Sequence, residues 1–125
     1  MRGEPTQIVA VVDDDSDVRS AIAGLVLSLG FGVRQFASGI EFLQSEDIKE
    51  TACLITDVRM PELSGVELHD RILELGYPLP TIFITAFQTP NLDAKLNAAG
   101  VIAILEKPVD AHVIAECIES AIGKS

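Results

Sequence analysis

The chain has 125 residues, of which 48% are hydrophobic, and its formal net charge is −10 at pH 7. This length and apolar content suit one domain over residues 1–125 with its own core, and they exclude a disordered tail. The negative charge argues against direct binding to nucleic acid or anionic lipid. The sequence has neither an apolar span of roughly 20 residues nor a signal peptide, which predicts a cytoplasmic protein outside the membrane.

Five short apolar runs, rich in β-branched residues, predict the strands. In chain order they span residues 8–12, 32–36, 53–56, 81–84 and 101–105, and the second run is weaker because it includes Arg34 and Gln35. Continuous runs of this kind are typical of parallel strands that are covered on both faces.

The segments between these runs begin with residues that favour helix starts. Ser38 and Ser64 each precede a glutamate by three residues, which is the spacing of a capping box. Thr89 followed by Pro90 predicts the start of a fourth helix, and Asp110 can cap the fifth.

Glycine and apolar spacing indicate where these helices end and which face they bury. Gly30 and Gly76 follow the first and third helical segments, and Gly100 predicts the end of the fourth. In the third segment, Leu68, Ile72 and Leu75 form one apolar stripe. Five strands alternating with five helices predict a doubly wound α/β sandwich with a core over about residues 8–122.

Polar side chains with phosphoryl-site chemistry follow the predicted strands. The first strand leads into Asp13 and Asp14, the third ends at Asp57, the fourth at Thr85, and Lys107 closely follows the fifth. Because the carboxyl ends of parallel strands share one edge, where ligands bind, we expect these side chains to converge.

Carboxylates gathered at one edge need compensation. Two of them about 5 Å apart repel by roughly 3 kcal/mol at an effective dielectric of about 20. The cluster must raise a pKa, pair with Lys107 or hold a hard cation, and open coordination positions favour Mg²⁺. A carboxylate can also be a nucleophile that forms an aspartyl-phosphate. For Asp15 and Asp17, capping of the first helix is a better explanation than membership of this phosphoryl and metal site.

Two other kinds of site are unsupported. A calcium loop starting at Asp13 would need glycine at position 18 and glutamate at position 24, where valine and glycine stand. Cys53 and Cys117 have no metal-ligand spacing and are interpreted as buried thiols. His69 and His112 have no partner at ligand spacing and are expected to be exposed on helices.

Five stretches carry a family resemblance when they are taken together, in order and at their spacings. They are Val11-Val12-Asp13-Asp14-Asp15, Leu54-Ile55-Thr56-Asp57-Val58-Arg59-Met60-Pro61, Ser64-Gly65, Ile84-Thr85-Ala86 and Leu105-Glu106-Lys107-Pro108. From about residue 8 to residue 122, the chain resembles the receiver domain of two-component response regulators. The stretch over residues 57–61 is similar to receivers that precede helix-turn-helix output domains.

The resemblance implies a flavodoxin-like fold and a signalling reaction. The fold is a five-stranded parallel sheet of strand order 2-1-3-4-5 with helices on both faces. A partner histidine kinase would phosphorylate Asp57 from its phosphohistidine. The chain would then be a phosphoacceptor with slow self-dephosphorylation and not a turnover enzyme.

The resemblance also assigns roles around Asp57. Asp14 and Asp57 would bind Mg²⁺ directly, together with the carbonyl of Arg59, and Asp13 would act mainly through water. The remaining contacts to the phosphoryl group would come from Lys107, the Thr85 hydroxyl and the Ala86 amide, and the peptide bond from Lys107 to Pro108 would be cis.

Signal output is the least regular part of the match. Similar receivers place an aromatic residue three positions before the lysine, where this chain has Ile104. We therefore expect a smaller movement at Ile104, with more of the conformational switch carried by Thr85 and the loop around Phe87.

The expected output surface consists of the fourth helix, the fifth strand and the fifth helix. A phosphorylation-dependent homodimer should form through the same surface. Phe87, near the site, should slow hydrolysis of the acyl phosphate. If the regulator has an output domain, that domain lies outside this chain.

Two alternatives remain at this point. A small Mg²⁺-dependent aspartyl phosphatase would need threonine or valine where Asp17 stands. A non-phosphorylated protein-binding module on the same fold would lack the nucleophile or the lysine, and both Asp57 and Lys107 are present.

Overall fold

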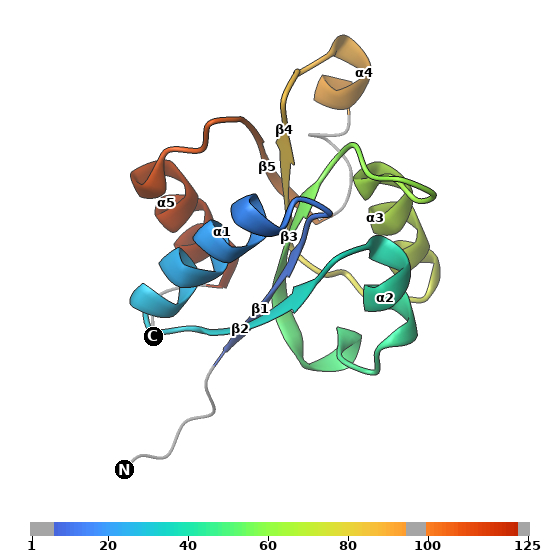
Figure 1. The fold of residues 1–125 in the computed structure, drawn as a ribbon. Coiled ribbons are helices and arrows are strands. Elements are labelled where there is room, and N and C mark those ends of the chain that lie inside the picture. Colours follow the sequence, from blue (N-terminus) through green and yellow to red (C-terminus); the bar gives the residue numbers. More distant parts are fainter. Residues whose placement is uncertain (1–6, 95–99, 123–125) are drawn as a thin grey trace.

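The computed structural model describes residues 7–94 and 100–122. A parallel five-stranded sheet lies at its centre, with strand order β2-β1-β3-β4-β5 (Figure 1). The strands are β1 (Ile8–Val12), β2 (Gly32–Phe36), β3 (Thr51–Asp57), β4 (Thr81–Thr85) and β5 (Val101–Glu106). The predicted fold and strand order are confirmed, and β3 begins two residues earlier than the sequence indicated.

Helices cover both faces of this sheet. They are α1 (Ser16–Ser28), α2 (Gly39–Gln44), α3 (Gly65–Glu74), α4 (Pro90–Asp93) and α5 (Ala111–Ile122), with a short 3₁₀ helix, η1 (Ile48–Glu50), before β3. α1 and α5 lie on one face, and α2 and α3 lie on the other (Figure 1). α4 begins after Thr89, as predicted; residues 95–99, in the second half of that predicted helix, lie outside the described residues.

Side-chain alternation along the strands divides the core into two layers. Val9 and Val11 of β1 pack with α1 and α5, whereas Ala10 and Val12 point to the layer beneath α2 and α3. Because successive strand residues face opposite sides, a strand that is apolar at every position can be buried on both. This double burial leaves the strand ends as the place where polar groups gather.

Most predicted caps are present. The Ser64 hydroxyl accepts from the Glu67 N–H while the Glu67 carboxylate accepts from the Ser64 N–H, which completes a capping box. Ser38 caps α2 through the Glu41 N–H, but the Glu41 carboxylate accepts from the Ala37 N–H instead. Asp15 caps α1, which is the capping role predicted for it.

The prediction that His69 is exposed is wrong. The buried residues of α3 are Gly65, Leu68, His69 and Ile72, which recur at helical spacing, while Leu75 at the end of the helix is 58% exposed. The imidazole of His69 packs edge-on against Phe83, with ring centroids 5.6 Å apart. The true buried stripe is therefore rotated from the one predicted through Leu75. His112 is exposed, as expected.

Candidate functional site

Three carboxylates meet at the carboxyl edge of the sheet. Asp13 directly follows β1 and Asp57 ends β3, and an oxygen of each lies within 4.8 Å of the other and of one from Asp14. The side chains of Asp13 and Asp57 are buried, whereas that of Asp14 is exposed. The predicted convergence of the acidic residues is confirmed, and the site opens to solvent on the Asp14 side.

Lys107 enters this cluster from the loop after β5. Its Nζ atom lies 3.1 Å from Oδ2 of Asp57 and 3.6 Å from Oδ2 of Asp13. The Lys107 backbone N–H donates to the carbonyl of Thr85, which ties this loop to the end of β4. The Lys107–Pro108 peptide bond is cis, as the resemblance implied.

Burial and mutual repulsion affect protonation within the cluster. Burial, reinforced by the charge of Asp57, raises the pKa of Asp13 to about 6 despite the opposing effects of the Asp15 amide and Lys107. Burial alone would lower the pKa of Lys107, but its hydrogen bond to Asp57 and the two carboxylate charges raise the pKa above its ordinary value. The lysine therefore stays charged beside the two aspartates.

The donor atoms fit a hard divalent cation. Within the described residues, Oδ2 of Asp13 is buried without a hydrogen-bond partner, a costly state for a carboxylate oxygen. Three converging carboxylates offer the oxygen ligands that Mg²⁺ prefers, and the exposed side leaves room for water. A cation here would satisfy the Asp13 oxygen and reduce the repulsion among the carboxylates.

The backbone around Asp57 is fixed by neighbours on both sides. The Val58 N–H donates to the Ile84 carbonyl at 2.9 Å, and the Gly65 N–H donates to the Val58 carbonyl at 2.8 Å. The Arg59 N–H donates to Oδ1 of Asp57 at 3.3 Å. These bonds hold Asp57 at the strand end with Oδ2 toward Lys107. The metal-binding role of the Arg59 carbonyl stays a prediction.

Thr85 lies at the end of β4 with its hydroxyl already engaged. The hydroxyl donates to the Phe87 carbonyl at 3.0 Å and accepts from the Phe87 N–H at 3.2 Å. Ala86, between them, is exposed. In this structure, Thr85 therefore bonds to its own loop, and the phosphoryl contacts predicted for Thr85 and Ala86 remain predictions.

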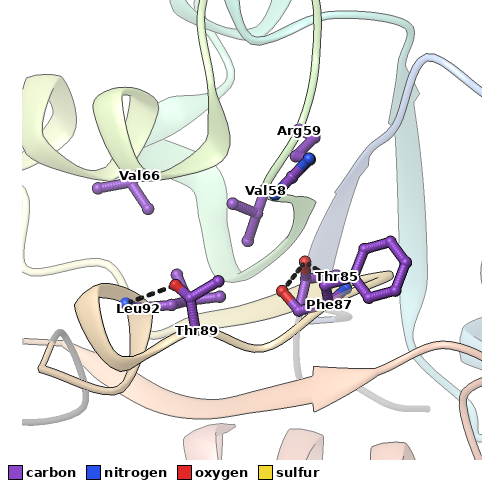
Figure 2. A pocket seen from close by; sticks show the side chains of 7 residues that line it. All are labelled: Val58, Arg59, Val66, Thr85, Phe87, Thr89 and Leu92. Carbon is purple, nitrogen blue, oxygen red and sulfur yellow. Dashed lines mark hydrogen bonds between the residues drawn. The ribbon is translucent and has the colours of Figure 1, made fainter.

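A small pocket opens beside Thr85. Its volume is about 260 Å³, and its lining residues are Val58, Arg59, Val66, Thr85, Phe87, Thr89 and Leu92 (Figure 2). The Phe87 side chain is 66% exposed, and its ring points away from Val66 and Leu92 (Figure 2). The pocket thus separates the strand end from α3 and α4 without being filled by the aromatic ring.

Ile104, at the position where similar receivers have an aromatic residue, is already in the core. Its side chain is 8% exposed and packs in a cluster with Phe83 and Leu92. Isoleucine at position 104 has no ring that could move between an exposed and a buried position. The sequence-based expectation of a smaller movement at Ile104 stays a prediction.

Arg19 is a residue of this region that sequence reasoning missed. Its Nη1 atom donates to the Asp13 carbonyl at 2.6 Å from the first part of α1. The only signal in the sequence was a basic residue six positions after Asp13, just inside the predicted helix.

Comparison with known proteins decides the family. Residues 9–119 match the family described as the response regulator receiver domain. The chain belongs to this family. It is a receiver domain of two-component response regulators, which are signalling proteins. The family match favours this function over the phosphatase considered above.

Full-length relatives and solved structures agree with this assignment. The chain is 36% identical over 115 residues to response regulator protein TmoT of Ectopseudomonas mendocina, covering 92% of this chain and 52% of TmoT. It is 35% identical over 113 residues to transcriptional regulatory protein FixJ of Rhizobium meliloti, covering 90% of this chain and 55% of FixJ. The chain thus spans about half the length of these curated relatives.

Two solved structures show the same fold at similar identity. The structure of response regulator StyR has a TM-score of 0.87 and 33% identity, covering 94% of this chain and 60% of that chain. The crystal structure of FixJ-N has a TM-score of 0.82 and 32% identity, covering 98% of each chain. Among the described residues, no helix has the length and apolar character to cross a membrane.

Proposed function

We propose that this receiver accepts a phosphoryl group on Asp57 from the phosphohistidine of a histidine kinase. The observation that carries the proposal is the 3.1 Å contact between Oδ2 of Asp57 and Nζ of Lys107, beside two further carboxylates. The Asp57 oxygen attacks phosphorus, the P–N bond to the kinase histidine breaks, and the imidazole leaves and takes up a proton. The product is an acyl phosphate on Asp57.

The surrounding residues have distinct parts in this transfer. Asp13, Asp14, Asp57 and the Arg59 carbonyl would hold Mg²⁺, which when bound neutralises phosphoryl charge. The Lys107 ammonium group, which pairs with the Asp57 carboxylate before phosphorylation, pairs with the phosphoryl oxygens afterwards.

Two groups from the end of β4 complete the phosphoryl contacts. The Ala86 amide and the Thr85 hydroxyl donate to the phosphoryl group, after the hydroxyl leaves the Phe87 carbonyl. Such charge-assisted hydrogen bonds are stronger than neutral ones, so the new contacts can replace those within the loop.

Phosphorylation serves a signal and not turnover of a substrate. We propose that the acyl phosphate hydrolyses slowly and that this cytoplasmic receiver passes the signal to an output region of a longer regulator. The length of the relatives supports the last point, because this chain corresponds to about half of each. The receiver itself contacts neither nucleic acid nor membrane.

Acetyl phosphate with Mg²⁺, followed by intact-mass measurement, tests the phosphoacceptor. We expect one phosphoryl adduct on the wild-type protein and none on Asp57→Asn. Asp47→Asn is the matched control, because Asp47 pairs with Arg34 in the segment before β3. Full labelling of Asp57→Asn would contradict the assignment.

The metal proposal has a separate test. Mg²⁺ should raise the melting temperature of the wild-type protein by ligand linkage, and Asp14→Ala should abolish both this rise and labelling by acetyl phosphate. Labelling of Asp14→Ala at the wild-type rate would show that Asp14 is not a metal ligand.

The surface for a phosphorylation-dependent homodimer is proposed around β5. This strand is at the edge of the sheet, and its Val101, Ile102 and Leu105 are only partly buried. Together with α4 and α5, it forms an accessible face next to Lys107. Sedimentation with and without beryllofluoride should show a larger species only with the phosphoryl analogue; a monomer under both conditions would exclude self-association of this chain.

A further inference from the structure

A half-buried arginine is bonded to the backbone of the acidic cluster. Nη1 of Arg19 donates to the carbonyl oxygen of Asp13 at 2.6 Å. This carbonyl belongs to the peptide group that joins Asp13 to Asp14. Because a peptide group is planar, fixing its carbonyl also fixes the direction in which the chain enters Asp14.

Asp13 itself is held from two more directions. Its backbone N–H donates to the Phe36 carbonyl at 3.1 Å, and its Oδ1 accepts from the Asp15 N–H at 2.9 Å. The Asp13 side chain is therefore anchored without Arg19. Asp14 is exposed, so the orientation of its carboxylate depends more on the backbone that leads into it.

We propose that Arg19 is a positioning residue for the cation site, which sets where the Asp14 carboxylate lies relative to Asp13 and Asp57. The inference rests on the proposed function, because it assumes that this cluster binds Mg²⁺. Arg19 does not touch the cation or the phosphoryl group. It acts through the Asp13–Asp14 peptide.

The direction in which Mg²⁺ affinity changes when Arg19 is replaced distinguishes a positioning role from a purely electrostatic one. Arg19 carries a positive charge that is bonded to the backbone of the acidic cluster, so removing that charge alone would not weaken the binding of a cation and could only strengthen it. Loss of positioning would weaken it. Groups that orient metal ligands typically change affinity by about 10–100-fold, whereas a half-exposed charge is screened by solvent and salt. We therefore expect the loss of positioning to dominate.

Titration calorimetry with Mg²⁺ alone tests this inference on three variants. Arg19→Met, which keeps the apolar stem but no donor, should bind Mg²⁺ about tenfold more weakly than wild type. Arg19→Lys, which keeps one donor and the charge, should recover most of the affinity. Arg34→Met is the control, because Arg34 pairs with Asp47 and Glu50; it removes the same charge and should leave affinity unchanged.

A second set of measurements distinguishes loss of positioning from general destabilisation of the fold. The melting temperatures of metal-free wild type and Arg19→Met should be similar, and the amide resonances of Asp14 and Asp15 should move in Arg19→Met but not in Arg34→Met. If Arg19→Met does not fold, Arg19→Gln, whose donor is two bonds shorter, replaces it.

Each outcome decides the matter. Wild-type or tighter Mg²⁺ binding by the folded Arg19→Met protein overturns the positioning role and leaves the proposed function intact. Absence of Mg²⁺ binding by the wild-type protein overturns the metal proposal and this inference with it.

Discussion

Gly65 lies directly against the carbonyl of Asp57. A methyl group at Gly65 would overlap the Asp57 carbonyl oxygen and lie 3.1 Å from the Cα atom of Val58. The Gly65 N–H meanwhile donates to the Val58 carbonyl at 2.8 Å. The first turn of α3 thus rests on the backbone of the strand end that carries the phosphoacceptor, and glycine is needed for this close approach.

Substitution of Gly65 should therefore destabilise the fold. We expect Gly65→Ala to lower the free energy of unfolding by about 1–3 kcal/mol, because backbone atoms must move to admit the methyl group. Gly24→Ala on α1 is the control: apart from its chain neighbours and the nearby backbone of its own helix, no atom lies within 4 Å of the added methyl, and we expect a gain of about 0.5–1 kcal/mol. Urea unfolding measures both, and equal stability of Gly65→Ala and wild type would contradict the steric argument.

The sequence predicted the acidic cluster because one topological rule determines it. Asp13, Asp57 and Lys107 each follow a separate apolar run, and parallel strands bring their carboxyl ends together whatever their distance along the chain. Strand alternation and capping are likewise local patterns. These signals sufficed for the parallel sheet, the two helical layers and the gathering of charges, whereas the strand order came from the family resemblance.

The features that were missed depend on contacts between elements. His69 looks polar in a helix, and only the packing of α3 on Phe83 shows that it is buried. The closeness of Gly65 to Asp57 and the bond from Arg19 to Asp13 depend on how each helix approaches a strand end. No spacing along the chain encodes these approaches.

The raised pKa of Asp13 should make metal-free stability depend on pH. The pKa of about 6 for Asp13 in the folded protein lies above the ordinary aspartate value of 3.8, so the folded state binds more protons than the unfolded chain between these values. Stability from this group is therefore fully present below about pH 4 and is lost as the pH rises to about 6. The expected loss is about 1–3 kcal/mol.

Asp13→Asn should remove this pH dependence, because the amide keeps an acceptor for Asp15 but does not titrate. In chelator-treated buffer, urea unfolding of the variant should be flatter than wild type from about pH 4 to 6, and the variant should be more stable at pH 7. Mg²⁺ should narrow the difference by stabilising the wild type. Parallel curves for the two proteins would show that Asp13 does not titrate in this range.

The two thiols should react slowly in the folded protein. Burial, with a smaller contribution from the nearby Cys117 thiol, raises the pKa of Cys53 to about 12. Burial also raises the pKa of Cys117, which is half-buried. Because the thiolate is the nucleophile, iodoacetamide at about pH 8 should modify Cys117 slowly and Cys53 only after unfolding. Peptide mass spectrometry with and without urea measures this, and rapid native labelling of Cys53 would contradict its burial.

Phe87 should slow loss of the phosphoryl group. Its exposed ring stands two residues after Thr85 and cannot orient an attacking water. We expect Phe87→Glu to hydrolyse the acyl phosphate about tenfold faster, because a carboxylate can act as a general base. Phe87→Leu, which keeps an apolar side chain, is the control. Equal half-lives for wild type and Phe87→Glu would indicate that Phe87 only packs on the loop.

The Thr85 hydroxyl cannot contact a phosphoryl group and keep both of its bonds to Phe87. It donates to the Phe87 carbonyl and accepts from the Phe87 N–H, so its single proton must be withdrawn from the loop before it can be donated elsewhere. Phosphorylation of Asp57 should therefore release the backbone of residues 86–88. With Ile104 already buried, this release is the movement we expect to carry most of the switch.

Thr85→Val, which keeps the branched shape but lacks the hydroxyl, separates phosphorylation from this release. It should still accept a phosphoryl group from acetyl phosphate, because Asp57 and Lys107 are unchanged. Beryllofluoride should shift the amide resonances of residues 86–88 in wild type and in Thr85→Ser, and much less in Thr85→Val. Any sedimentation change should be lost in the same variant. Shifts as large in Thr85→Val as in wild type would show that the loop responds to Asp57 by a route that bypasses Thr85.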